Sequence, residues 1–569
     1  MGQPLPPPRL QPIDATTLRA LVAELRGAVV PSRFEKAQQP DGPTLQLALR
    51  HLGGVQWLEV SWLAEAPRLL AIPPPPRQGE GSTLASQVQH ALRGLALVAI
   101  RQQGWERVVS FAFAPRPGEP PERQLVLELM GRHSNLFLLN GQEQVIALAR
   151  QVRPTQSRWR PIGTGDPYTA PPALSGEVPR SEEPRDRWQR RLLALPQPLG
   201  EALLDTYQGL SPALVRQLLE APREGGEALA GEQPVQHLNA DQWEQLWSRW
   251  QAWLLAVEQE RFALRWDPRG GYRCWGGSAE EPRAPLATHA ALATATRAWL
   301  DARELERRRG ALRHRLEGLA ERQGRQRREQ EALLVAATDS DQLQRQADAL
   351  LCLPAPSKEQ IQEAQTLYRR ARKQRRSVAA IQPRLEAHQQ RQAWLEEALV
   401  YVDQADHADQ LAALEEDLRQ LEPRAKAVSR EATRPRPRGE TVAAAPHPLE
   451  LRSPSGLCLQ VGRNHRQNDW ISLRQARRGD LWFHAQEVPG SHVVLKASVA
   501  AAAEADLAAA ADLAAHFSQG RGNARVPVVM VPVEALQRLP GAGAGTVRHR
   551  GGEILWGHPD RARALLAAS

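Results

Sequence analysis

The sequence predicts an α+β multidomain protein in which a long helical arm joins two mixed modules. Three observations predict it: short runs of alternating apolar and polar residues near both ends, regularly spaced leucines in the middle, and a Pro-, Arg- and Ala-rich stretch before the last module. A chain of 569 residues is long enough for several separate cores. We therefore expect five segments, at residues 1–178, 179–285, 286–429, 430–449 and 450–569.

Composition limits the classes of function. The net charge of +9 favours a polyanionic partner without choosing between nucleic acid and an anionic membrane. The three cysteines, Cys274, Cys352 and Cys458, are far apart, which argues against a disulfide framework or a structural zinc site, so no metal is predicted. No apolar run approaches the ~18 residues of a membrane helix, and the start of the chain lacks an apolar segment. We expect a cytoplasmic protein that contacts no membrane.

The first segment reads as an α+β module with a mostly antiparallel sheet. Asp14 is a good N-cap for a helix that we expect to end at Gly27 and to bury one face of leucine and valine side chains. A second helix is expected at residues 82–92. Strand-like alternation occurs at residues 44–50, 55–62, 97–102, 107–113, 125–130 and 135–139.

The second segment is helical and rich in tryptophan. Two short helices are expected to meet at residues 209–212, with Ser211 as the N-cap and Pro212 at the first helical position. This is similar to a helix-hairpin-helix, whose amides can hold a phosphate, although packing alone is the favoured role. Four tryptophans at near-helical spacing are typical of a core: Trp243, Trp247, Trp250 and Trp253.

The third segment has the apolar spacing of a coiled coil. Its first helix carries an a/d seam of Leu305, Leu312, Leu316 and Leu319, and its second carries Ile381, Leu385, Leu395, Leu399 and Val402. Two prolines at residues 351–357 separate them, which predicts an antiparallel hairpin reaching roughly 75 Å. A basic cluster favours salt-dependent phosphate contact: Arg369, Arg370, Arg372 and Lys373. The acidic stretch 403–422 reads as a solvated face, and residues 430–449 as a flexible basic linker.

The last segment contains the most informative stretch, DLWFHAQEVPGSHVVLK at residues 480–496. The turn at Pro489–Gly490 predicts a hairpin that brings together Trp482, His484, Ser491 and His492. Upstream, VGRNHRQNDW at residues 461–470 is rich in arginine and amides. Rings, guanidinium groups and amides suit unpaired RNA, but tryptophan and histidine beside strands also suit a core, so both interpretations stay open.

These two stretches, together with LELMGRHSNLFLLN at residues 127–140, resemble the C-terminal and N-terminal modules of the NFACT family. The resemblance implies an N-terminal module similar in fold to that of the formamidopyrimidine glycosylases and a C-terminal RNA-binding module. It implies tRNA contact by Asp14, Glu106 and Arg107, although the family has Asp where Glu106 stands, which moves the carboxylate by about one methylene. Arg132, His133 and Asn135 would contact RNA or support that surface, and a tight turn at Gly131 is an equally open interpretation. In the last module it implies RNA contact by Arg463, Asn464, Asp469, Trp482, His484, Pro489, Gly490, Ser491 and His492.

The resemblance also implies a function in ribosome quality control. Such a protein binds the large ribosomal subunit, through its rRNA and proteins, while a peptidyl-tRNA on the stalled subunit still obstructs it. It recruits alanyl-tRNA for template-free alanine tailing, which marks the stalled chain for degradation. The ribosome performs the peptide transfer, so the implied protein is not an enzyme and uses no cofactor.

Two other functions compete with this one. The sequence has no P-loop, GxSxG or HExxH motif, so no catalytic residue is predicted. A DNA-repair glycosylase of the similar fold would need Pro-Glu after the initiator Met and a four-cysteine zinc finger, and both are missing from this sequence. A surface adhesin is the third possibility, because some relatives carry a fibronectin-binding name.

Overall fold

The computed structural model describes residues 10–220, 228–267, 270–276, 286–337, 340–421, 447–539 and 543–567. The chain divides into two compact units, residues 6–301 and residues 302–569. The predicted basic linker, apart from residues 447–449, lies outside the described residues. The division into five segments stays a prediction.

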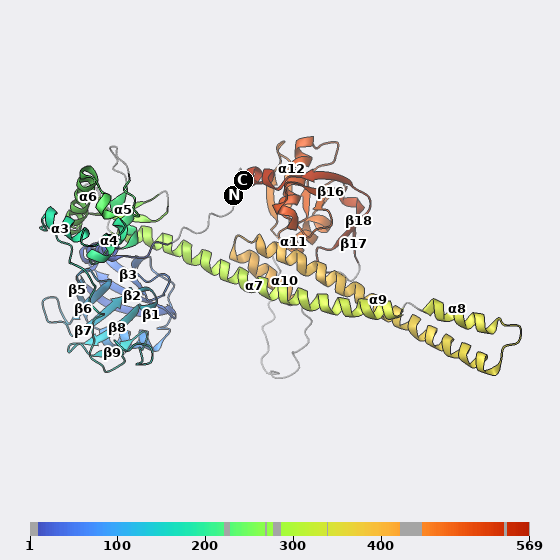
Figure 1. Ribbon diagram of the computed structural model, residues 1–569, viewed down its shortest axis with the longest axis horizontal. Helices are drawn as coiled ribbons and strands as arrows, with labels where there is room; N and C mark the ends of the chain where they lie inside the picture. The colour runs from blue at the N-terminus through green and yellow to red at the C-terminus, as the bar shows by residue number, and fades with distance from the viewer. Residues whose placement is uncertain are drawn as a thin grey trace. The chain divides into compact units, whose positions relative to one another are not determined.

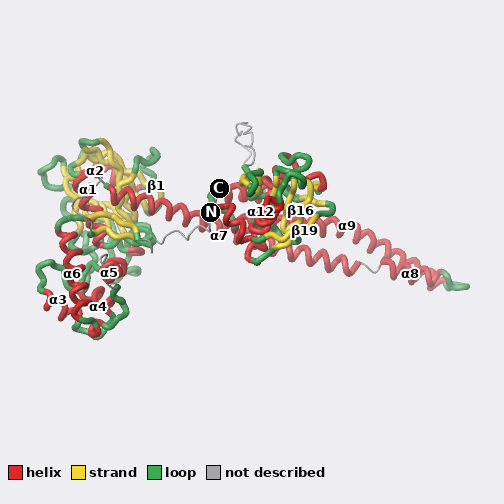
Figure 2. The backbone as a smooth tube through the Cα atoms, turned by 90° about the horizontal axis from the view of Figure 1, so that it is seen from above, coloured by secondary structure: helices red, strands yellow, loops and turns green. Residues whose placement is uncertain are grey.

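An antiparallel sheet of nine strands dominates the first unit (Figures 1 and 2). Its order is β4-β3-β2-β1-β5-β6-β7-β8-β9. The strands are β1 (Ser32–Asp41), β2 (Thr44–His51), β3 (Gly54–Ser61), β4 (Arg68–Ile72), β5 (Ala96–Gln102), β6 (Val108–Ala114), β7 (Arg123–Glu128), β8 (Asn135–Asn140) and β9 (Val145–Leu148). The six predicted strands are confirmed, whereas β1, β4 and β9 were not predicted.

Two helices accompany this sheet. α1 (Ala15–Val29) begins at the predicted N-cap, where Asp14 accepts from Thr17 N at 2.8 Å, and α2 (Thr83–Leu92) begins after Ser82. The predicted end of α1 at Gly27 is wrong by two residues. Val29 is buried in the core with the sheet strands, and this packing outweighs the weak helix propensity of glycine.

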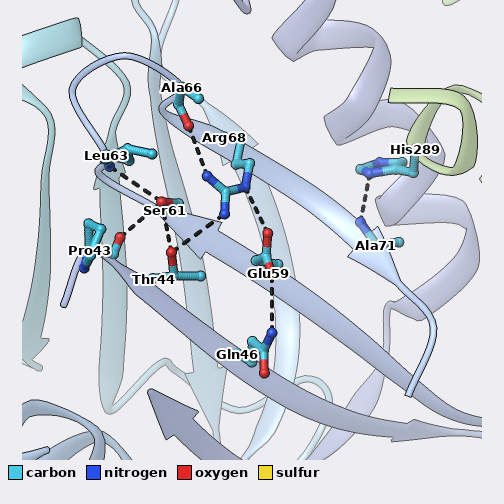
Figure 3. A network of polar contacts seen from close by, with 10 residues as sticks. All are labelled: Pro43, Thr44, Gln46, Glu59, Ser61, Leu63, Ala66, Arg68, Ala71 and His289. Carbon is cyan, nitrogen blue, oxygen red and sulfur yellow. Dashed lines mark hydrogen bonds and ion pairs between the residues drawn. The ribbon is translucent and has the colours of Figure 1, made fainter. Parts of the chain in front are cut away.

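Buried polar side chains connect strands β2, β3 and β4 (Figure 3). Arg68 Nε donates to Glu59 Oε1 at 2.7 Å, and Gln46 donates to the same carboxylate at 3.0 Å. His289, near the start of α7 (Ala287–Ala337), accepts from Ala71 N on β4 at 2.9 Å and contacts Leu21 O on α1 at 2.9 Å. These contacts fix the beginning of α7 to the sheet module.

The rest of the first unit is the predicted helical segment. It contains α3 (Arg185–Leu192), α4 (Leu199–Thr206), α5 (Pro212–Leu219), α6 (Ala240–Glu258), β10 (Phe262–Trp266) and β11 (Tyr272–Trp275). Ser211 caps α5 through Leu214 N, as predicted. The tryptophan stripe on α6 lies in the core, also as predicted, and the β10–β11 hairpin was not predicted.

Four helices make up the arm: α7, α8 (Ser340–Leu351), α9 (Lys358–Asp403) and α10 (Ala408–Leu421). The predicted break before Ser357 is confirmed, and Ser357 caps α9. One helix of the arm was not predicted: α10 forms a separate helix that packs with α7 and α9 around Leu312, Leu395 and Leu414. The acidic stretch is also not simply solvated, because Asp417 is only 6% exposed and pairs with Arg466.

The last module holds a six-stranded sheet in the order β12-β13-β15-β14-β16-β19 and a small β17–β18 hairpin. Its elements are β12 (Leu449–Arg452), β13 (Cys458–Val461), α11 (His465–Asp469), β14 (Leu481–Ala485), β15 (Val493–Leu495), α12 (Glu504–His516), β16 (Val526–Pro532), β17 (Leu536–Arg538), β18 (Val547–His549), β19 (Glu553–Gly557) and α13 (Pro559–Ala567). The predicted β14–β15 hairpin is confirmed. α12 packs so closely on the sheet that a Cβ on Gly557 would lie 2.3 Å from Ala511 O.

Candidate nucleic-acid interface

One end of the nine-stranded sheet gathers the predicted residues of the first module. Residue 108 pairs with Glu128, and Glu128 pairs with Asn135, so the start of β6, the end of β7 and the start of β8 lie together. Gln102 Nε2 donates to Glu106 O at 2.8 Å and to Ala15 O at 3.1 Å, which places the beginning of α1 at the same end. The sequence-predicted residues here therefore share one region.

Glu106 and Arg107 lie just before β6, and both are half-buried. Glu106 Oε1 accepts from Leu174 N at 3.2 Å, so the segment that closes the module holds this carboxylate in place. Burial raises the pKa of Glu106, while the hydrogen bond from Leu174 and the charge of Arg107 lower it. The glutamate thus presents a positioned acceptor beside a guanidinium group.

Asp14 is buried at this end of α1, with 7% exposure. One of its oxygens caps α1, and the other accepts from Ser211 Oγ at 2.6 Å. Ser211 is itself the cap of α5. Both oxygens are used inside the protein, so Asp14 fixes the helical segment against the sheet module.

The GRHSN turn separates into an exposed and a buried part. Arg132 and His133 are exposed, with Arg132 Nε 3.0 Å from His133 Nε2. Asn135 is 3% exposed, and its amide bonds the backbone of Arg150 in both directions, at 2.8 Å and 2.9 Å. Asn135 is therefore bonded inside the protein, and the turn presents the Arg and His side chains to solvent.

Sequence reasoning missed a second basic loop beside this turn. Arg150 donates to Arg132 O at 2.7 Å, and the following loop exposes Arg153, Arg158 and Trp159, the last with 92% exposure. Arg160 anchors the loop by donating to Glu128 at 2.8 Å. The sequence signal was the run VRPTQSRWRP, which holds three arginines around one tryptophan.

Three of the four residues predicted to lie together in the last module do so, and the exception is Ser491. The ring centroids of Trp482 lie 5.5 Å from His484 and 5.0 Å from His492, and the two histidines are 5.4 Å apart. His492 Nδ1 is 2.8 Å from Ser472 Oγ. Ser491 does not join them, because it is fully buried and its amide donates to Phe517 O at 2.8 Å.

These rings line a pocket of about 350 Å³. Trp482 and His492 are buried, and His484 is partly exposed, so the cluster is the inner wall of the pocket instead of an open stacking surface. Glu397 of α9 and His549 of β18 complete the lining. Sequence reasoning missed both, because they are distant in the chain from the motif.

The other predicted residues of this module make hydrogen bonds and ion pairs, some with the helices of the arm and some within the module. Arg463 donates to Gln404 O at 2.6 Å and to Asp406 at 2.7 Å. Asn464 caps α11 through Gln467 N, and Asp469 pairs with Arg538 at 3.2 Å. The Pro489–Gly490 turn is held in the same way: Tyr401 of α9 donates to Gly490 O at 3.2 Å, and a Cβ on Gly490 would lie 2.8 Å from Ser518 Cβ.

The basic cluster of the arm is open to solvent. Arg369, Arg370, Arg372 and Lys373 on α9 are exposed, and no ion pair engages them within the described part of the chain. Tyr368 beside them donates to Asp348 of α8. Four unpaired cations on one exposed stretch of helix suit contact with phosphate groups.

Neither a candidate metal centre nor a candidate membrane-spanning helix occurs in the described ranges. They contain no group of three or more His, Cys, Asp or Glu side chains that could hold a metal ion. None of the helices in those ranges has the length and hydropathy that crossing a membrane requires.

Comparison with known families matches both ends of the chain. Residues 14–355 and 355–434 match the family described as NFACT N-terminal and middle domains, and residues 449–551 match the NFACT protein RNA binding domain. The Rqc2 homolog RqcH of Bacillus subtilis is 24% identical over 82% of this chain and 84% of its own length. That of Streptococcus pneumoniae is 23% identical over 96% of this chain and 98% of its own length.

Solved structures give partial matches. The N-terminal part of the fibronectin/fibrinogen-binding protein from Streptococcus suis is 19% identical, with a TM-score of 0.38 over 49% of this chain and 97% of its own. The C-terminal part of that protein is 23% identical, with a TM-score of 0.37 over 46% of this chain and 98% of its own.

Proposed function

Because the chain belongs to the NFACT family, we propose that it is an RNA-binding factor of ribosome quality control that binds obstructed large ribosomal subunits and recruits tRNA to them. One observation carries the proposal: the family's N-terminal and RNA-binding regions both match, and relatives named Rqc2 homolog RqcH align along nearly the whole chain. Its partners would be ribosomal RNA and proteins, a tRNA, and the peptidyl-tRNA that blocks the subunit.

The geometry of the first module supports tRNA contact at the sheet end. Arg107, Arg132 and His133 offer donors to phosphate and base edges, and Glu106 offers an acceptor. Asp14 and Asn135 hold this surface from inside through their buried hydrogen bonds. Side chains that are already positioned lose less conformational freedom on binding RNA.

Within this proposal the protein positions RNA and the ribosome makes the peptide bond. The recruited tRNA would be alanyl-tRNA, and repeated delivery would add a template-free alanine tail that marks the stalled chain for degradation. No cofactor is part of the proposal, and it places the protein in the cytoplasm, where translating ribosomes are found.

The test is recovery of RNA with the protein. The tagged chain is isolated from cells, its co-sedimentation with large subunits is measured, and the bound small RNA is sequenced. We expect enrichment of alanine tRNA, and we expect Arg107→Ala to lose the tRNA while keeping the subunit. Arg101→Ala, an exposed arginine on neighbouring β5, is the matched control. Recovery of no tRNA, or of all tRNAs in their cellular proportions, would contradict the proposal.

A further inference from the structure

The pocket in the last module has walls suited to a flat ring. Trp482 and His484 stand on alternate positions of β14 with their rings nearly parallel, at an angle of 10°, while His492 meets Trp482 edge-on at 78°. His549 of β18 lies 6.0 Å from Trp482 and is exposed. At about 350 Å³ the pocket falls in the range of small-molecule sites, about 300–1,000 Å³.

Two buried polar atoms of this wall have no protein partner. Trp482 Nε1 and His484 Nε2 are both enclosed and make no hydrogen bond within the described part of the chain. Unsatisfied buried donors and acceptors are rare in folded proteins, because their lost hydration is not replaced. Burial lowers the pKa of His484 and of His492, so both rings are neutral near pH 7 and can stack without charge.

A carboxylate stands at the edge of the pocket. Glu397 comes from α9, with a side chain that is 21% exposed, and its Oε2 lies 3.2 Å from His465 Nδ1. A carboxylate only accepts hydrogen bonds. Among the RNA bases, guanine alone presents two adjacent donors, N1–H and N2–H, on its Watson–Crick edge. Adenine and uracil each present one donor there.

Two exposed arginines are the chain neighbours of His549, one of the residues that line the pocket. Arg548 and Arg550 stand on either side of His549, all three are exposed, and neither arginine is ion-paired in the ranges that the structure describes. Arginines beside an aromatic pocket are the combination that holds a single strand: phosphates on the guanidinium groups and a base on the rings.

We propose that this pocket captures one unpaired guanine of an RNA strand. The base stacks on the exposed His549 ring of the pocket, its Watson–Crick edge donates to Glu397, and the neighbouring phosphates contact Arg548 and Arg550. The inference rests on the proposed function for the RNA-binding role of the module, and it deepens that role by naming the base.

The test compares three labelled heptanucleotides at one fixed salt concentration: UUUGUUU, UUUAUUU and UUUUUUU. The full-length protein should bind the first about fivefold or more tighter than the others, as expected for one bidentate contact to a base edge. Glu397→Gln should remove this preference and keep the weaker, salt-dependent binding of all three. His549→Ala should weaken the binding of all three about fivefold, the effect of losing one stacking ring. Glu396→Gln, on the same turn of α9, is the matched control and should behave like wild type.

A photo-crosslinking residue in place of His549 identifies the source of the base. Labelling of a guanine in ribosomal RNA or in tRNA supports the inference, whereas labelling of protein alone overturns it. Equal binding of the three heptanucleotides, or a preference that survives in Glu397→Gln, also overturns it. Co-sedimentation of wild type with large subunits is scored separately. If the protein co-sediments with large subunits but shows no preference for guanine, only the guanine proposal is overturned. If it prefers guanine but does not co-sediment, only the proposed ribosomal role is overturned.

Discussion

His289 is enclosed between α1 and β4, and burial lowers its pKa from 6.5 to about 4. The ring is neutral in the folded protein, while the unfolded chain takes up a proton below pH 6.5. Its contribution to stability is therefore complete above that pH, falls as the pH drops towards 4, and changes no further below it. A shift of this size corresponds to about 3 kcal/mol.

We expect the amide of Ala71 to lose protection from hydrogen exchange over this pH window, after correction for the intrinsic exchange rate. In His289→Gln, which has no titrating ring, the loss should be smaller by up to about 3 kcal/mol. An identical pH dependence in the two proteins would show that the ring is not the titrating group. His51→Gln is the control, because His51 is a histidine of the same sheet that is not buried.

The buried pair of Arg68 and Glu59 gives a second prediction at this scale, since these side chains are 5% and 11% exposed. Arg68→Met leaves a buried carboxylate without its partner, which should lower the free energy of unfolding by about 3–5 kcal/mol. Urea denaturation measures it. Arg50→Met, at an ion pair in which the Arg50 and Glu35 side chains are 56% and 32% exposed, should cost less than about 1 kcal/mol. A small loss in Arg68→Met would show that water or another cation replaces the arginine.

At the scale of single residues, the sequence revealed local roles better than distant ones. The caps formed by Asp14 and Ser211 follow from side chains that bond amides three residues ahead. The hydrogen bond between the same two residues joins positions 197 apart, and no pattern in the chain announces it. For the same reason Trp482 and His484 were recognised in the motif, but Glu397 and His549 were not.

At the scale of elements, α10 is an acidic helix whose side chains could pack against the protein or only face solvent. Asp417 is buried and pairs with Arg466 of α11, and burial raises its pKa while Arg466 lowers it. Asp417→Ala should lower the free energy of unfolding by about 2 kcal/mol, because it removes the ion pair with Arg466 at a buried position. Thermal unfolding measures it. Asp409→Ala, at an exposed position of the same helix, should have little effect, and equal losses would contradict the packed role of α10.

Elements with a regular apolar period were predictable, and the others were not. The α9 seam and strands β2 and β3 follow a period that the sequence displays. β1 lies in the middle of the sheet, yet it buries Gln38 and Ser32 and carries charged residues, so it does not look like a strand. The position of β1 is determined by its neighbours β2 and β5, which is information beyond its own residues.

For the molecule as a whole, charge should govern ribosome binding through the arm. Replacing Arg369, Arg370, Arg372 and Lys373 by glutamine removes four exposed cations from α9. If they contact phosphates, the slope of log affinity against log salt concentration should become shallower by about 3, since each contact contributes about 0.7–0.9. Co-sedimentation with large subunits over a series of potassium chloride concentrations measures the slope. The same exchange at Arg307, Arg313, Arg375 and Arg419, which are ion-paired, is the control and should change it less.

The contacts of the Tyr401 hydroxyl group limit where the chain can be truncated. It belongs to α9, yet it is enclosed in the last module, where it accepts from Asn468 at 2.7 Å and donates to Gly490. An expression clone that starts at residue 450 would omit this tyrosine and leave a vacant hole in its product. A truncated protein that keeps the module intact should therefore retain the helices that precede it. A gene rearrangement that moved the module alone would lose Tyr401 and its hydrogen bonds.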